Sequence, residues 1–179
     1  MKLGLSVKSQ SVETSGITKD YREALCEYVW NGFEANANRV ELYFVANELD
    51  GVAKVIISDN GDGIGYSSLE DTFGAFLASQ KSGLSLQLKS KANKGKGRFS
   101  FLAFASNAQW KTVCKGDKGN LAYNVLLDEI NKNEYEVTDP VETTGQTGTV
   151  VSITGVDALK MADVSYETLE GTFLQVFAW

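Results

Sequence analysis

The sequence predicts one compact domain that combines helices with a β-sheet. Its 179 residues are enough to bury a sizeable core. Residues 18–36 place apolar side chains at helical spacing, whereas several later segments alternate apolar and polar residues as strands do. Neither a repeat nor a linker interrupts the chain, so we expect a single domain over residues 1–179.

The first third of the chain is expected to contain one long helix between strands. Residues 2–8 alternate apolar and polar side chains and predict an edge strand or arm. Thr18 is the expected N-cap of the helix over residues 18–36. Strands over residues 39–46 and 52–58 follow and are joined by a short turn.

The remainder of the chain is expected to complete the sheet and add shorter helices. Residues 79–97 are rich in Ser, Lys and Gly without a steady period, which predicts a loop. The expected helices cover residues 69–78, 99–105 and 165–177, and the expected strands cover residues 108–114, 120–127, 135–137 and 149–154.

The composition excludes several kinds of chemistry. The chain contains no histidine, which excludes histidine-dependent triads and histidine-ligated zinc. Its two cysteines, Cys26 and Cys114, are too few for a four-ligand site, so any metal here would be a hard ion held by oxygen atoms. The sparse cysteines, together with the lack of a signal-like or membrane-spanning apolar run, predict a cytoplasmic location.

Positive charge is concentrated in one part of an acidic chain. The net charge is −6, yet residues 73–115 contain eight Lys and Arg residues and no Asp or Glu. Such a segment predicts either a local site for an anion, such as a polyphosphate, or a solvated lysine-rich loop. The acidic remainder would repel a long nucleic acid, so nucleic acid is expected to bind only through other domains.

Two polar residues share one face of the predicted first helix. Glu27 and Asn31 are four residues apart and therefore lie one turn apart, with Glu34 on the next turn. A carboxylate can take a proton from an attacking water, and an amide oxygen can bind Mg²⁺. On spacing alone, the exposed polar stripe of an amphipathic helix is the simpler explanation.

A glycine-rich loop, residues 59–65, follows the second predicted strand of the first third. The carboxylate of Asp59, at the end of that strand, can accept a hydrogen bond from an exocyclic amine such as that of adenine. We expect Gly61, Gly63 and Gly65 to supply positive φ angles and room for close approach of a ligand.

Two other uses of this loop fail on residue type. A calcium-binding loop over residues 58–69 would need a bidentate glutamate at its last position, where Leu69 stands. A dinucleotide fingerprint would need a G-x-G-x-x-G step, whereas these glycines are spaced two apart.

Four segments in the right order resemble the motifs of the GHKL ATPase superfamily, which includes gyrase, heat-shock chaperones, histidine kinases and MutL. They are residues 27–42, 57–64, 94–100 and 147–151. The first is most similar to that of MutL-like members, and the chain as a whole resembles the MutL- and chaperone-like branch most. Two positions depart from the pattern of the family. Glu34 stands where an aspartate is usual, and Ala92 stands where the phosphate-lid motif often has its first glycine.

The resemblance implies ATP and Mg²⁺ as cofactors and a role for each matched residue. Glu27 would be the general base and Asn31 the Mg²⁺ ligand. Asp59 would bind the adenine amine, with Gly63 beside the base and Thr149 in support. The other implied cofactor-binding residues are Gly61, Lys81, Lys94, Gly95, Lys96, Gly97, Arg98 and Phe99.

The resemblance also implies the fold and the function. The fold would be α/β (α+β): a two-layer sandwich in which helices cover one face of a mixed, mostly antiparallel sheet, known as the Bergerat fold. The function would be that of a Mg²⁺-dependent ATPase domain that couples ATP to conformational change in a larger protein. A non-hydrolysing ATP sensor and a kinase-type domain that phosphorylates a separate protein are the alternatives.

The expected partners are ATP or ADP, the protein's own downstream domains and a second protomer, with no membrane. The apolar end, residues 177–179, leads us to expect the N-terminal part of a longer protein. Hydrolysis by this chain alone is expected to be slow, because the resemblance implies that a second domain supplies a catalytic lysine.

Overall fold

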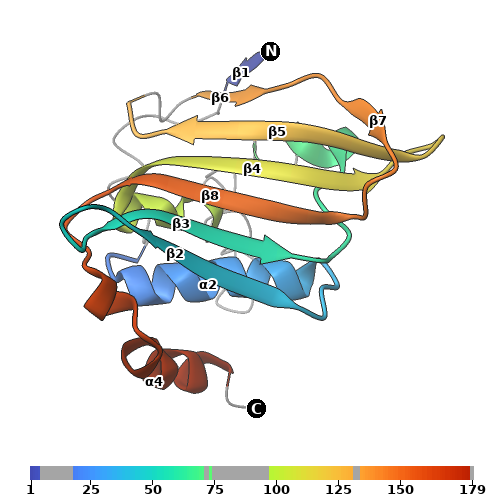
Figure 1. The fold of residues 1–179 in the computed structure, drawn as a ribbon. Helices are drawn as coiled ribbons and strands as arrows, with labels where there is room; N and C mark the ends of the chain where they lie inside the picture. The colour runs from blue at the N-terminus through green and yellow to red at the C-terminus, as the bar shows by residue number, and fades with distance from the viewer. Residues whose placement is uncertain (5–17, 71–72, 74–96, 131–133, 178–179) are drawn as a thin grey trace, which may run out of the picture.

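The computed structural model describes residues 1–4, 18–70, 73, 97–130 and 134–177 (Figure 1). The strands are β1 (Lys2–Gly4), β2 (Val40–Ala46), β3 (Val52–Asp59), β4 (Ala105–Lys115), β5 (Asn120–Asp128), β6 (Glu134–Val137), β7 (Val141–Thr143) and β8 (Gly148–Val156). The α-helices are α2 (Tyr21–Glu34) and α4 (Tyr166–Phe177), and the 3₁₀ helices are η1 (Tyr66–Ser68), η5 (Gly97–Ala103) and η6 (Met161–Val164).

The described strands form one eight-stranded sheet. Its order is β1-β6-β5-β4-β8-β3-β2, with β7 paired to β5, and each of these pairings is antiparallel. Helix α2 lies along β2 and β3 in Figure 1. The predicted fold class, an α+β sandwich with a mostly antiparallel sheet, is therefore confirmed.

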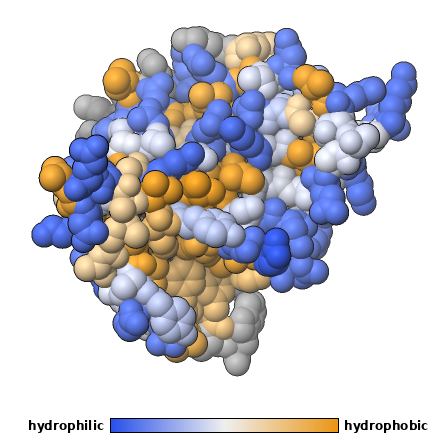
Figure 2. Space-filling view, in the orientation of Figure 1, coloured by the Kyte–Doolittle hydropathy of each residue, from blue (hydrophilic) through white to orange (hydrophobic). Residues whose placement is uncertain are grey.

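The two faces of the sheet differ in character because side chains alternate along each strand. In β4, Trp110 and Thr112 are buried on the side of the helices, whereas Asn107 and Lys111 point to the other face and are exposed. Figure 2 shows hydrophilic and hydrophobic residues interspersed on the visible face of the molecule. The core thus lies between the sheet and the layer that contains α2 and η5.

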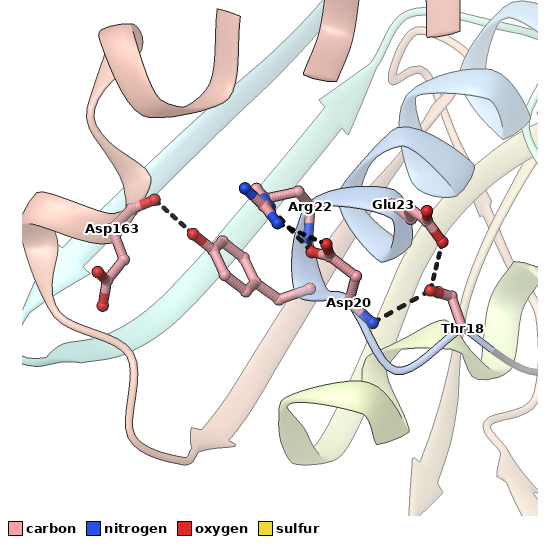
Figure 3. A network of polar contacts seen from close by, with 6 residues as sticks. Thr18, Asp20, Arg22, Glu23 and Asp163 are labelled. Carbon is pink, nitrogen blue, oxygen red and sulfur yellow. Dashed lines mark hydrogen bonds and ion pairs between the residues drawn. The ribbon is translucent and has the colours of Figure 1, made fainter. Parts of the chain in front are cut away.

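Helix α2 begins three residues later and ends two residues earlier than the range 18–36 that the sequence predicted. Its N-cap is Asp20, whose carboxylate accepts a hydrogen bond from the backbone N–H of Arg22 at 2.9 Å. The expected cap, Thr18, is wrong: its hydroxyl instead donates to Glu23 at 2.6 Å and accepts from the N–H of Asp20 at 3.1 Å (Figure 3).

Tyr21 joins the start of α2 to the C-terminal part of the chain. Its hydroxyl donates to the backbone carbonyl of Asp163 in η6 at 2.8 Å (Figure 3). At the other end of α2, the rings of Trp30 and Phe33 contact Phe177 of α4, with centroids 5.9 and 6.1 Å apart. These contacts hold α4 beside α2.

Several expected elements differ from the structure. The segment expected to start an α-helix over residues 99–105 is the 3₁₀ helix η5, and residue 105 already belongs to β4. Strand β7 was not predicted, since three residues after Pro140 carry almost no periodic signal. Of the helix expected over residues 69–78, only residues 69, 70 and 73 lie in the described ranges, as does only residue 97 of the loop expected over 79–97.

Among the helices that the structure describes, none combines the length and the apolar character needed to cross a membrane.

Candidate nucleotide-binding site

A cavity of about 320 Å³ lies between α2, the sheet and η5. Its volume falls within the range of small-molecule sites, roughly 300–1,000 Å³. Hollows of about 380 and 450 Å³ lie elsewhere, and one of about 660 Å³ adjoins this cavity at Asp59 and Thr149. Of these four, only the 320 Å³ cavity brings Asn31 of the first motif together with Asp59 of the second. It is lined by Tyr28, Asn31, Gly32, Glu34, Ala35, Ile57, Asp59, Gly63, Ile64, Gly65, Ser68, Phe73, Arg98, Trp110, Thr149 and Val151.

Three polar residues form a row across neighbouring strands at one end of the cavity. Asp59 of β3 is the cross-strand partner of Thr149 of β8, and Thr149 is the partner of Thr112 of β4. The hydroxyl oxygens of Thr112 and Thr149 lie 3.1 Å apart. The Thr112 hydroxyl also accepts a hydrogen bond from the N–H of Ile64 at 2.9 Å. The register of the sheet thus ties the loop after β3 to the row.

Asp59 is half-buried, and its carboxylate already interacts with the backbone. The N–H of Gly61 donates to Oδ1 of Asp59 at 2.9 Å. Burial raises the pKa of Asp59 above its ordinary value, and the backbone N–H groups of Gly61 and Thr149 oppose that rise. The remaining acceptor capacity of the carboxylate is available to a hydrogen-bond donor in the cavity.

Of the three loop glycines, one adopts a positive φ and two allow close packing of the backbone. Of the three expected to have positive φ, only Gly63 does, at 72°, while Gly65 has φ −64°. A Cβ at Gly63 would lie 2.1 Å from the carbonyl oxygen of Val113, and one at Gly61 would lie 2.4 Å from that of Ala35. Gly61 and Gly63 therefore let the loop pack tightly between α2 and β4.

Gly148 and Gly32 bring other chain segments close to Asp59. Gly148 has φ 146°, and a Cβ there would lie 2.4 Å from the carbonyl oxygen of Asp59. On α2, a Cβ at Gly32 would lie 2.7 Å from Val40 and 3.2 Å from the Cβ of Asp59. The absence of a side chain at Gly32 lets α2 approach the end of β3, so that Asn31 reaches the cavity.

Glu27 and Asn31 lie one turn apart on α2, as the sequence predicted. Asn31 lines the cavity, and Glu27 lies beside it next to Gly97, where a Cβ would come within 2.7 Å of the Glu27 carboxylate. The Glu27 side chain is accessible to solvent. Even so, desolvation by the surrounding protein, followed by repulsion from Glu34 and Glu23, raises its pKa.

Tyr28 fixes η5 against α2. Its hydroxyl donates to the carbonyl oxygen of Arg98 at 2.9 Å and accepts from the N–H of Phe101 at 3.2 Å. This pair of bonds places Gly97 against Glu27 and directs the Arg98 side chain towards Phe73, whose ring centroid lies 4.6 Å from the guanidinium carbon.

The structure brings together most of the predicted residues that it describes. Asn31, Asp59, Gly63, Arg98 and Thr149 line the cavity, and Gly61, Gly97 and Glu27 adjoin it. The side chain of Phe99 is buried in the core, which leaves its backbone for any contact with a ligand. Lys81, Lys94, Gly95 and Lys96 lie outside the described residues.

Four contributors to the site were not singled out in the sequence. Gly32, Phe73, Trp110 and Thr112 act through close packing or through the register of the sheet. A glycine within the amphipathic pattern of α2 was the one local signal that could have drawn attention to such a position.

The side-chain oxygen atoms of Asn31 and the nearby Glu27 and Glu34 suit a hard cation, but they do not form a cage. Within the described ranges, no group of three or more His, Cys, Asp or Glu residues is arranged to hold a metal ion. Asn31 and the nearby carboxylates would hold Mg²⁺ only together with oxygen atoms from a ligand and water.

Comparison with known proteins agrees with this geometry. The family model described as "Histidine kinase-, DNA gyrase B-, and HSP90-like ATPase" matches residues 19–155, so the chain belongs to this family, the GHKL ATPases. This membership supports an ATP-binding ATPase domain.

A solved structure titled "Crystal Structure of N terminal domain of a DNA repair protein" has a similar fold, with a TM-score of 0.52 and 24% sequence identity. The similarity covers 94% of this chain and 46% of that one, so this chain spans less than half the length of that structure. No curated protein sequence matches the chain.

Proposed function

We propose that the chain binds ATP together with Mg²⁺, hydrolyses it, and couples this cycle to conformational change in a larger protein. The observation that carries the proposal is the convergence of Asp59, Thr149 and Asn31 on one cavity from two neighbouring strands and a helix. In this arrangement, a base with an exocyclic amine would lie at Asp59, and its phosphates would extend towards Asn31.

The adenine end would be recognised by the row of polar side chains formed by Asp59, Thr149 and Thr112. The Asp59 carboxylate would accept a hydrogen bond from the amine, and the Thr149 hydroxyl, held by Thr112, would support it directly or through water. Ile57 and Val151 line the same cavity from neighbouring strands and would supply apolar contact to the base. This combination of apolar walls and a few fixed polar groups is typical of small-molecule sites.

The phosphate end would lie between α2 and η5. Asn31 would give its amide oxygen to Mg²⁺, which would complete its coordination with phosphate oxygens and water. Gly97 lies so close to the Glu27 carboxylate that a Cβ there would come within 2.7 Å of it. We propose that Lys81, Lys94, Gly95 and Lys96 complete this end, since they belong to the segment free of acidic residues.

Glu27 would act as the general base on the attacking water. Burial raises the pKa of Glu27, which makes its carboxylate a stronger proton acceptor. In the wider proposal, further domains and a second protomer of a MutL- or chaperone-like protein respond to the nucleotide. A cytoplasmic location agrees with two free, buried cysteines.

The test separates binding from hydrolysis. Calorimetry should detect binding of ADP and ATP with Mg²⁺, and Glu27→Gln should keep that affinity. In a single-turnover assay with protein in excess over ATP, the wild-type chain should release phosphate faster than Glu27→Gln by two orders of magnitude or more, roughly the contribution of a general base.

The remaining outcomes assign the alternatives. Binding without phosphate release would favour an ATP sensor if it persists, with Glu27→Gln behaving as wild type, when the domain expected to supply the catalytic lysine is present. Transfer of phosphate to an added partner protein would favour a kinase-type domain. Absence of nucleotide binding would contradict the proposal.

A further inference from the structure

Ile64 is held at both of its backbone polar groups by side chains of the sheet. Its N–H donates to the Thr112 hydroxyl of β4 at 2.9 Å, and its carbonyl oxygen accepts a hydrogen bond from the Tyr123 hydroxyl of β5 at 2.6 Å. Thr112 and Tyr123 are direct cross-strand partners, so their side chains lie next to each other on one face of the sheet. We call these two hydrogen bonds the Ile64 clamp.

The Ile64 clamp lies where the backbone of the loop is least restricted. Gly63 precedes Ile64 with a φ of 72°, and Gly65 follows it. Glycine loses more conformational freedom on ordering than any other residue, so this stretch depends on external partners for a fixed conformation. Gly63, Ile64 and Gly65 all line the 320 Å³ cavity. The clamp therefore determines where one wall of the cavity lies.

Tyr123 also contacts the chain just after the loop. Its ring meets the ring of Tyr66 edge-on, with centroids 5.1 Å apart and an angle of 79° between the planes. Tyr66 begins η1, two residues after Ile64. Tyr123 is not among the residues that line the 320 Å³ cavity, so it would act on a ligand there through the loop.

Core packing alone does not account for the hydroxyl of Tyr123. The side chain is buried, and phenylalanine would fill the same space without removing a hydroxyl from water. Burial of a hydroxyl costs free energy unless it forms a hydrogen bond. Desolvation raises the pKa of Tyr123, so the phenol stays protonated and serves as the donor to Ile64. The hydroxyl is thus explained by its bond to the loop.

We propose that Tyr123 is a positioning residue, which holds Ile64 and the glycines beside it in the conformation that receives the nucleotide base. The inference rests on the proposed nucleotide site and gives β5 a part in base binding. Without the hydroxyl, a ligand would have to order the loop itself, and the cost of ordering would be subtracted from its affinity. The phosphates would bind at the other end of the cavity and should not respond.

The test compares two variants that lose the same kind of hydrogen bond. Tyr123→Phe removes the bond to Ile64 but keeps the ring contact with Tyr66. Tyr21→Phe is the matched control, because the Tyr21 hydroxyl also donates to a backbone carbonyl, that of Asp163 at 2.8 Å, and Tyr21 does not line the 320 Å³ cavity.

Three measurements are made on each protein. Calorimetry gives the affinities for adenosine and ADP, thermal unfolding gives the stability, and NMR-detected hydrogen exchange without ligand reports on the backbone N–H of Ile64. This exchange reports on local opening of the loop, which is separate from global unfolding.

Tyr123→Phe is expected to weaken adenosine and ADP binding by the same factor, about 5- to 30-fold, which corresponds to about one hydrogen bond. The Ile64 N–H should exchange at least about fivefold faster than in the wild type, because the loop opens more often. Tyr21→Phe should lose stability to a similar extent but match the wild type in both affinities and in the exchange of Ile64.

Several results would overturn the role of Tyr123. These are unchanged affinities in Tyr123→Phe, an equal loss in Tyr21→Phe, unchanged exchange of the Ile64 N–H, and a loss for ADP without one for adenosine. In each of these cases the nucleotide site stands, provided that the wild type binds ADP. If the wild type binds neither ligand, the proposed nucleotide site is wrong and the role of Tyr123 is wrong with it.

Discussion

Asp59 and Thr149 face each other across β3 and β8, and the hydroxyl of Thr149 lies 3.1 Å from that of Thr112 on the next strand. The sheet register therefore aligns three polar side chains that are far apart in the sequence. Two of them, Thr112 and Thr149, are buried. Buried polar groups normally form hydrogen bonds. Here the loop after β3 provides one, because the N–H of Ile64 donates to the hydroxyl of Thr112.

Thr112→Val should lower the free energy of unfolding by about 1–3 kcal/mol, because the N–H of Ile64 loses its acceptor while the side-chain shape is kept. Thr154→Val, at an exposed position of β8, is the control and should change stability by less than about 0.5 kcal/mol. Urea denaturation of both variants makes the comparison. Equal effects would show that the hydroxyl at position 112 does not support the loop.

Two glycines at the site should respond differently to alanine. At Gly63 a Cβ meets the backbone of Val113 and φ is 72°, so Gly63→Ala should cost about 1–2 kcal/mol for the left-handed conformation, with a further cost for the clash. At Gly97 the Cβ meets the end of the Glu27 side chain, which can move. Gly97→Ala should therefore keep most of the stability but slow phosphate release in a single turnover.

Thermal unfolding and phosphate release, measured on the same preparations, distinguish these two effects. A strongly destabilised Gly97→Ala variant with normal phosphate release would contradict the placement of Gly97 beside the catalytic carboxylate.

The pH dependence of stability should have opposite signs at Asp59 and Asp20. Burial raises the pKa of Asp59 in the folded state, so the folded protein binds more protons and this contribution to stability falls as pH rises above the unfolded value. The side-chain hydrogen bond from Arg22 lowers the pKa of Asp20, so its contribution is present above the unfolded value and is lost as pH falls.

Urea denaturation between about pH 3 and pH 7 tests both signs. Relative to wild type, Asp59→Asn should gain stability as pH rises through this window, and Asp20→Asn should lose stability. If the stability of the two variants relative to wild type changed with pH in the same direction, the opposite pKa shifts of Asp59 and Asp20 would be contradicted.

Ala158 adopts a left-handed conformation, with φ 58°, at an exposed position between β8 and η6. A residue with a Cβ is disfavoured there by about 1–2 kcal/mol, so Ala158→Gly should stabilise the chain by about 0.5–1 kcal/mol after the greater entropy of glycine in the unfolded state is included. Ala53→Gly, at an exposed position of β3, should instead destabilise it. A lower melting temperature for Ala158→Gly would be inconsistent with this backbone conformation.

The sequence predicted the parts of the site that depend on local pattern. Helical spacing put Glu27 and Asn31 on one face, and the apolar run before Asp59 marked the end of a strand. The register between strands could not be predicted in the same way, because the sequence around Thr112 does not show which residue of β8 lies opposite it. The contact between Arg98 and Phe73 depends on tertiary packing, and the 3₁₀ geometry of η5 places apolar residues much as a short α-helix would.

Recognition of the exocyclic amine of adenine by Asp59 is the central feature of the proposed site. The most direct measurement is calorimetry of ADP and GDP binding to the wild type and to Asp59→Asn. Asparagine keeps an acceptor for the N–H of Gly61 but presents an amide to the base, and guanine carries a carbonyl where adenine carries its amine.

We expect the wild type to prefer ADP over GDP by at least 10-fold. Asp59→Asn should weaken ADP binding by about 10- to 100-fold, the equivalent of losing one charge-assisted hydrogen bond, and should abolish the preference. Unchanged ADP affinity in Asp59→Asn, or equal affinities of the wild type for ADP and GDP, would contradict the account.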